Sequence, residues 1–114
     1  MRILCLLFTS PVQHRGPEHM LKLVEEMTGK GNRVELFLLG DGVYNSSAAL
    51  ATKKGAPVVL ALSQMRGIRI TDCSTCAGMR GVDELIGNAR LGTLEDLTEE
   101  MERADVILSY TGEE

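Results

Sequence analysis

Residues 2–8 read Arg2-Ile3-Leu4-Cys5-Leu6-Leu7-Phe8, an apolar run in which only the first residue is charged. A half-buried strand would alternate apolar and polar residues, whereas this segment is apolar on both of its faces. Strands of this kind are typical of a parallel sheet that helices cover on both sides. The segment therefore predicts a buried central strand and, with it, an α/β fold.

Strand and helix patterns alternate along the rest of the chain. Pro17 suits the first turn of a helix, and Gly29 is expected near its end. Thr93 and Asp96 form the pattern of a capping box at the start of a later helix. The predicted buried positions of these two helices are Met20, Leu23, Val24 and Met27, and Leu94, Leu97 and Met101. The other predicted strands cover residues 34–39, 68–71, 89–92 and 106–110.

Three short segments are less clearly patterned. The apolar run 58–62 could be a strand or a buried helix, but Pro57 before it and Gly67 after it favour a helix. We expect a turn over residues 42–47, then one or two helical turns over 48–51. A further short helical piece is predicted over residues 82–86.

These elements predict a single domain over residues 1–114, a size usual for one hydrophobic core. Because strands and helices alternate throughout, the expected architecture is a three-layer α/β/α sandwich of flavodoxin-like appearance. Its sheet is expected to be mostly parallel, with about five strands.

Composition narrows the classes of function. The net charge is −4 and no basic run is present, so direct nucleic-acid binding is not expected. No segment approaches the length of a membrane span, and the amino-terminal run lacks the features of a signal peptide. We therefore expect a cytoplasmic protein whose thiols stay reduced. In that setting a C-x-x-C pair indicates redox, metal or sulfur chemistry rather than a structural disulfide.

The loops that follow the predicted strands should meet at one edge of the sheet, where open parallel sheets place their sites. Three such loops cover residues 9–16, 40–46 and 72–78. The polar and thiol side chains that they would bring together are Thr9, Ser10, His14, Asp41, Tyr44, Asn45, Cys73 and Cys76.

Cys73 is the candidate reactive thiol because it follows a predicted strand and precedes a helical turn. Free backbone N–H groups and the helix dipole would stabilise a thiolate there, with Arg80 adding positive charge and Asp72 opposing it. Two roles stay open for Cys76, packing under the turn or serving as a resolving thiol. Cys5 lies inside the first apolar strand and is expected to be a buried hydrophobe.

The composition gives little support for a metal or another cofactor. A structural zinc site needs four ligands, and the chain has three Cys and two His with Cys5 expected to be buried. We therefore predict no cofactor and no metal site.

The chain resembles the DsrE/TusD-like (DsrEFH-like) sulfur-relay family. The resemblance rests on residues 41–45, on Cys73 followed by residues 77–82, and on residues 104–108. It implies a doubly wound parallel sheet and an oligomer, either homomeric or with sister subunits. It also implies that Cys73 takes sulfur as a persulfide from a donor protein and passes it to an acceptor, a sulfurtransferase or sulfur-carrier role.

Two features depart from that family pattern. Cys76 is an extra thiol, and the segment between Asn45 and Pro57 is shorter than in TusD-type subunits. The alternatives are a non-catalytic oligomeric binding or regulatory module of the same fold, and a C-x-x-C dithiol redox protein. The residues expected at the catalytic position or at the substrate and partner edge are Cys73, Cys76, His14, Asp41, Tyr44, Asn45 and Arg80.

Overall fold

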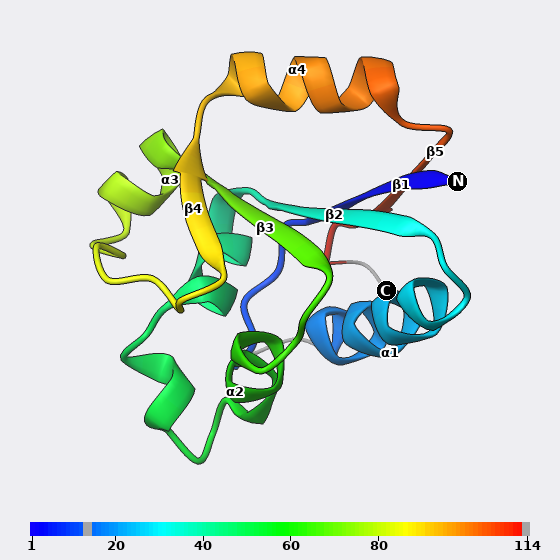
Figure 1. The fold of residues 1–114 in the computed structure, drawn as a ribbon. Helices are drawn as coiled ribbons and strands as arrows, with labels where there is room; N and C mark the ends of the chain where they lie inside the picture. The colour runs from blue at the N-terminus through cyan, green and yellow to red at the C-terminus, as the bar shows by residue number, and fades with distance from the viewer. Residues whose placement is uncertain (13–14, 113–114) are drawn as a thin grey trace.

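A parallel sheet forms the centre of the computed structural model, which describes residues 1–12 and 15–112 (Figure 1). Within these residues the sheet has five strands in the order β4-β3-β2-β1-β5, and every neighbouring pair is parallel. The strands are β1 (Arg2–Leu7), β2 (Arg33–Leu38), β3 (Ile68–Cys73), β4 (Ala89–Gly92) and β5 (Val106–Tyr110).

Helices cover both faces of this sheet. Figure 1 shows α1 and α2 on one face and α4 on the other, so the expected three-layer α/β/α sandwich is confirmed. The ambiguous run 58–62 is helical, as Pro57 and Gly67 indicated. The helices are α1 (Gly16–Gly29), α2 (Pro57–Ser63), α3 (Ser74–Met79) and α4 (Leu94–Arg103), with 3₁₀ helices η1 (Gly40–Ser46) and η2 (Leu50–Thr52).

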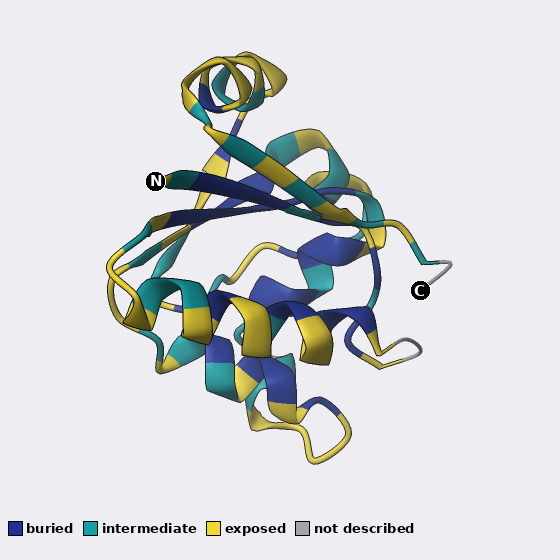
Figure 2. Ribbon diagram, turned by 90° about the vertical axis from the view of Figure 1, so that its right-hand side faces the viewer, coloured by how far each residue is buried: buried dark blue, intermediate teal, exposed yellow. Residues whose placement is uncertain are grey.

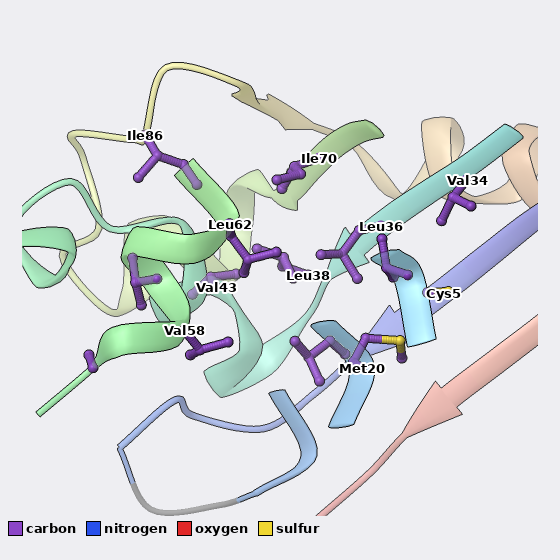
Figure 3. Packing of buried hydrophobic residues seen from close by; sticks show 14 of the residues in the cluster. Cys5, Met20, Val34, Leu36, Leu38, Val43, Val58, Leu62, Ile70 and Ile86 are labelled. Atoms are coloured by element: carbon purple, nitrogen blue, oxygen red, sulfur yellow. The ribbon is translucent and has the colours of Figure 1, made fainter. Parts of the chain in front are cut away.

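The larger hydrophobic core lies between the sheet and helices α1 and α2 (Figure 3). Cys5 of β1 lies opposite Leu36 of β2 in the parallel register, and both are almost completely buried. Met20 and Val24 of α1 pack against the same core. The alternate residues Leu4 and Phe37 face α4, which explains why the first strand is apolar on both faces.

The buried face of α1 differs from the prediction at one position. Leu23 is 36% exposed, whereas Leu21, Met20 and Val24 pack against the core. The band of buried residues in Figure 2 follows this face of the helix. Because the helix lies over β1 and β2, the residue one turn after Pro17 is the one that meets the sheet, and Leu23 is turned to solvent.

The predicted buried face of α4 is largely wrong. Leu94 is 61% exposed and Met101 is 43% exposed, whereas Leu97 is partly buried against the sheet. The most buried residue of this helix is Glu100. The capping box is confirmed, because the Thr93 hydroxyl accepts from the Asp96 N–H and Asp96 accepts from the Thr93 N–H.

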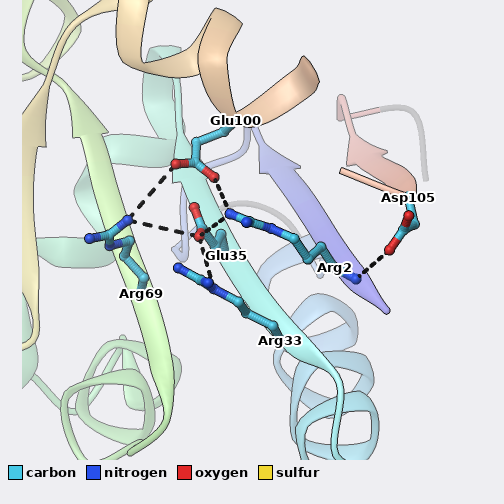
Figure 4. Close-up of polar contacts among 6 residues, drawn as sticks. All are labelled: Arg2, Arg33, Glu35, Arg69, Glu100 and Asp105. Atoms are coloured by element: carbon cyan, nitrogen blue, oxygen red, sulfur yellow. Dashed lines mark hydrogen bonds and ion pairs between the residues drawn. The ribbon is translucent and has the colours of Figure 1, made fainter. Parts of the chain in front are cut away.

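An ionic cluster between the sheet and α4 explains the burial of Glu100 (Figure 4). Its carboxylate lies 3.7 Å from Arg2 of β1 and 3.9 Å from Arg69 of β3. Arg2, Arg33 and Arg69 also lie within ion-pairing distance of Glu35 on β2. Two buried carboxyl groups here need compensating cations, so helix α4 turns its acidic side inward.

The pKa values of the two carboxyl groups of this cluster shift in opposite directions. Burial raises the pKa of Glu35, and its hydrogen bond to Glu100 raises it further. The same hydrogen bond lowers the pKa of Glu100, which Arg2 and Arg69 also favour as a carboxylate. Glu100 is therefore the more readily ionised of the two, and its carboxylate lies within ion-pairing distance of Arg2 and Arg69.

Two predicted local structures are corrected. Residues 82–86 form no helix; Val82 and Ile86 are buried, and Leu85 forms an antiparallel bridge with Ser47. The pairing of this segment with the chain after η1 replaces the internal hydrogen bonds of a helix. Most of the predicted turn over 42–47 lies in η1, which begins earlier, at Gly40, and ends at Ser46.

Candidate functional site

Cys73 is the last residue of β3 and directly precedes α3. Its side chain lies on the α4 face of the sheet, packed with Leu4, Phe37 and Leu39, and is only 4% exposed. The sequence predicted a polar loop position for this thiol. The strand instead continues two residues further than expected, and the alternation of β3 turns Cys73 inward.

The sequence predicted surroundings that stabilise the Cys73 thiolate, but the surroundings in the structure do the opposite. Burial raises its pKa, and the neighbouring Cys76 side chain, which interacts directly with the Cys73 thiol, raises it further. The backbone N–H groups of Cys76 and Thr75 act in the opposite direction, as expected at the start of a helix. Desolvation is the largest of these effects, so the free thiol is stabilised in its protonated form.

A surface cleft of about 380 Å³ opens beside Cys73. It lies between the start of α3 and the start of α4, because Cys73 and Gly92 are partners in the β3–β4 register. Its walls combine hydroxyl groups, one apolar side chain and one carboxylate. The lining residues are Cys73, Ser74, Thr75, Thr93, Leu94 and Glu95.

Cys76 lies one helical turn later and is more exposed than Cys73. Arg80 donates to its carbonyl oxygen at 3.3 Å and to Asp41 Oδ1 at 2.8 Å. The hydrogen bond to Asp41 is the main cause of the raised pKa of Arg80, and attraction to Asp41, Cys76 and Tyr44 adds to it. The predicted residues Asp41, Tyr44 and Arg80 therefore gather around Cys76 rather than Cys73.

Other predicted edge residues lie inside the protein. Asn45 is completely buried, and its amide donates at 2.9 Å to the carbonyl oxygens of both Thr9 and Gly42. The Asn45 side chain does not reach the surface and instead fixes the loop after β1 against η1. Ser10 accepts a hydrogen bond from the Val12 N–H. His14 lies outside the described residues.

Asp72 is a feature of this region whose role sequence reasoning missed. It is fully buried on the face opposite Cys73 and is hydrogen-bonded to Ser46 Oγ. Ser46 Oγ is also hydrogen-bonded to the Val43 carbonyl at 2.9 Å. Ser46 Oγ donates to Asp72 Oδ2, and this hydrogen bond lowers the pKa of the acid. Burial is the larger effect and raises the pKa of Asp72 to about 7.

The structure also bears on the expectations about metal sites, membrane spans and Cys5. Among the residues that the structure describes, His, Cys, Asp and Glu side chains form no group of three that could hold a metal ion. Every helix within residues 1–12 and 15–112 is too short or too polar to cross a bilayer. Cys5 is completely buried as expected, and burial raises its pKa to about 11.

Comparison with known proteins now decides the family. Residues 1–110 match the sequence model of the DsrE/DsrF-like family. The chain belongs to this family. The resemblance seen in the sequence is therefore confirmed, and it covers nearly the whole DsrE/DsrF-like chain.

Solved structures share the fold of this DsrE/DsrF-like chain. The YchN protein of E. coli matches with a TM-score of 0.85 and 22% identity, covering 96% of this chain and 99% of that one. MTH1491 of Methanobacterium thermoautotrophicum, whose function is described as unknown, matches with a TM-score of 0.73 and 13% identity, covering 96% and 98%. No curated protein matches by sequence. At these identities the likeness extends to the fold alone.

Proposed function

We propose that this DsrE/DsrF-like chain is a sulfurtransferase or sulfur-carrier subunit that holds sulfane sulfur as a persulfide on Cys73. One observation carries this proposal: Cys73 lies beside a cleft of about 380 Å³, with N–H groups of Thr75 and Cys76 directed at its sulfur. The cleft has room for an added sulfur atom. The N–H groups favour negative charge on the sulfur that they face.

The chemistry needs no cofactor. A thiolate of the carrier attacks the outer sulfur of a persulfide on a donor protein, forming a new S–S bond. The donor's own S–S bond breaks and its sulfur leaves as a thiolate, so one sulfur atom moves and nothing is oxidised or reduced overall. The reverse attack by an acceptor thiolate would unload Cys73 in the same way.

We also propose that a partner surface surrounds the cleft. Leu94 lines the cleft and is 61% exposed. An exposed apolar side chain at a reactive site favours docking of another protein, either further copies of the chain or sister subunits. Analytical ultracentrifugation is expected to show an oligomer; a chain that stays monomeric at micromolar concentration would contradict self-association.

A second function is favoured by a different observation. Cys73 is 4% exposed and burial raises its pKa, which suits a non-catalytic binding or regulatory module with an inert thiol. A dithiol redox role would instead require a reversible Cys73–Cys76 disulfide, and both thiols are free in the structure. Sulfur loading separates these alternatives, because only a carrier gains and keeps a sulfur atom.

The experiment compares the variants Cys73→Ser and Cys76→Ser after loading with inorganic polysulfide. Cys73 is buried, whereas Cys76 is only partly buried, so a competing thiol should remove sulfur from Cys76 in the Cys73→Ser variant roughly tenfold faster than from Cys73 in the Cys76→Ser variant. Mass spectrometry of the intact chain follows the loss of one sulfur atom. Equal lifetimes in the two variants would contradict a sheltered carrier site at Cys73.

A further inference from the structure

One carboxylate stands in the wall of the cleft beside Cys73. It belongs to Glu95, whereas the other lining side chains are hydroxyl groups, the thiol and Leu94. Glu95 is exposed, and within residues 1–12 and 15–112 no cation lies within ion-pairing distance of its carboxylate. Its negative charge is therefore available to whatever enters the cleft.

The other charges near this wall do not cancel that of Glu95. Asp96, the next residue, accepts a hydrogen bond from the Thr93 N–H at 2.8 Å, and this bond is the main cause of its lowered pKa. Attraction to Arg90 of β4 is a smaller cause of the same shift. Because Arg90 is placed to offset Asp96, the mouth of the cleft keeps the negative charge of Glu95.

The deep end of the cleft has the opposite character. Backbone N–H groups of Thr75 and Cys76 act to lower the pKa of Cys73, so they favour negative charge on the sulfur there. The positive end of α4 is compensated, because Glu95 and Asp96 lie in its first turn and the capping box is complete. The cleft thus pairs hydrogen-bond donors at the sulfur with a carboxylate at the mouth.

A partner cysteine with a Lys or Arg beside it matches both parts of the cleft. Its sulfur can carry negative charge toward the N–H groups, while the neighbouring cation lies near Glu95. Free polysulfide has negative charge and no cation, so Glu95 repels it. Leu94 is 61% exposed on the same wall and offers apolar contact to the chain of a partner, which a small anion cannot use.

We propose that Glu95 makes the cleft selective for a partner segment in which Lys or Arg neighbours the cysteine that exchanges sulfur. This inference rests on the proposed carrier function. During loading, Cys73 gives up its proton to solvent and its thiolate attacks the outer sulfur of the partner's persulfide. An S–S bond forms on Cys73 and the partner's S–S bond breaks. The partner's own sulfur leaves as a thiolate, which the adjacent cation stabilises.

Three short synthetic peptides test this preference. They differ only in the residue beside a single persulfidated cysteine, which is Lys, Gln or Glu. Alkylation and fragmentation of the protein follow the rate at which sulfur appears on Cys73. At low ionic strength the Lys peptide should load Cys73 roughly threefold faster than the Gln peptide, and the Glu peptide roughly threefold more slowly. High salt should reduce these differences.

Glu95 variants separate the protein's preference from the reactivity of the peptides themselves. Glu95→Gln should slow loading by the Lys peptide and speed loading by inorganic polysulfide, each roughly threefold. These opposite changes cannot come from a general loss of structure. Glu95→Lys should favour the Glu peptide. Glu102→Gln removes the same charge from an exposed position at the other end of α4 and should leave all the rates unchanged.

Each outcome has a separate meaning. If Glu95→Gln leaves the differences among the peptides unchanged, or Glu102→Gln narrows them equally, Glu95 does not select the partner. If polysulfide loads Cys73 but no peptide does, the preference for a cationic partner is wrong and the carrier function stands. If neither source leaves sulfur on Cys73, the carrier function itself is wrong.

Discussion

Asp72→Asn is expected to make the protein more stable than the wild type at pH 8 and to flatten the pH dependence of its stability. Burial raises the pKa of Asp72 to about 7, whereas the unfolded chain has a value near 3.8. The folded state therefore keeps a proton that the unfolded state loses. As the pH rises from about 4 to about 7, the free energy of unfolding should fall by about 4 kcal/mol on this account alone.

The sign and size follow from the surroundings of this acid. Below pH 4 Asp72 is protonated in both states and has no effect, whereas above pH 7 ionising it in the core opposes folding. Asn cannot ionise, and its amide oxygen can still accept from Ser46 Oγ. Urea unfolding of both proteins at several pH values measures the difference. The raised pKa of Glu35 also makes the free energy of unfolding fall as the pH rises, in both proteins. The test is therefore the difference in free energy of unfolding between the wild type and Asp72→Asn at each pH. A difference that does not change with pH would contradict a raised pKa of Asp72.

Gly42→Ala should destabilise the fold by about 3 kcal/mol or more. A Cβ at this position would lie 1.9 Å from the Leu7 carbonyl oxygen and 2.7 Å from its carbonyl carbon. These are backbone atoms at the end of β1, and the same oxygen accepts the Leu39 N–H. Neither can move without breaking the sheet, so η1 would have to separate from β1.

Gly55→Ala is the matched control for this substitution. Gly55 lies in the exposed loop before α2, and a Cβ there would meet nothing within 4 Å. Thermal or urea unfolding should show a change within about 0.5 kcal/mol for Gly55→Ala. Equal losses in the two variants would show that the close approach of η1 to β1 is not what requires glycine at position 42.

Much of the fold could be predicted because local signals were strong. The apolar run of β1 indicated a covered parallel strand, Pro17 and Gly29 bounded α1, and Thr93 with Asp96 marked the start of α4. Each signal depends on residues close together in the chain. The order of the strands, by contrast, depends on pairing between distant segments.

The errors arose where distant residues decided the outcome. Helix α4 buries Glu100 rather than Leu94 because arginines on β1 and β3 lie beneath it, and no pattern within the helix shows them. The pairing of Asp72 with Ser46 likewise joins β3 to η1. The sequence did offer one signal for the cleft. If the predicted strand 89–92 is paired with the end of β3, Thr93 and Leu94 come to lie beside Cys73.

The arrangement of the candidate site residues differs from the one expected from the sequence. The sequence placed Cys73 in the loop after a strand, but Cys73 is the last residue of β3, and alternation along β3 makes Asp72 and Cys73 face opposite sides of the sheet. Arg80 was expected beside Cys73 and lies with Cys76 and Asp41 instead. That separation gives the two thiols different surroundings, which the spacing C-x-x-C alone does not show.

The location of the added sulfur in the wild-type chain tests the central claim most directly. The protein is loaded with inorganic polysulfide, freed of excess reagent, alkylated and fragmented, and each of its three cysteines is scored for an extra sulfur atom. The account predicts one sulfur atom, on Cys73, with Cys5 unmodified because it is completely buried. A chain that retains no sulfur, or that holds it at equilibrium on Cys76, would contradict the claim that Cys73 is the carrier.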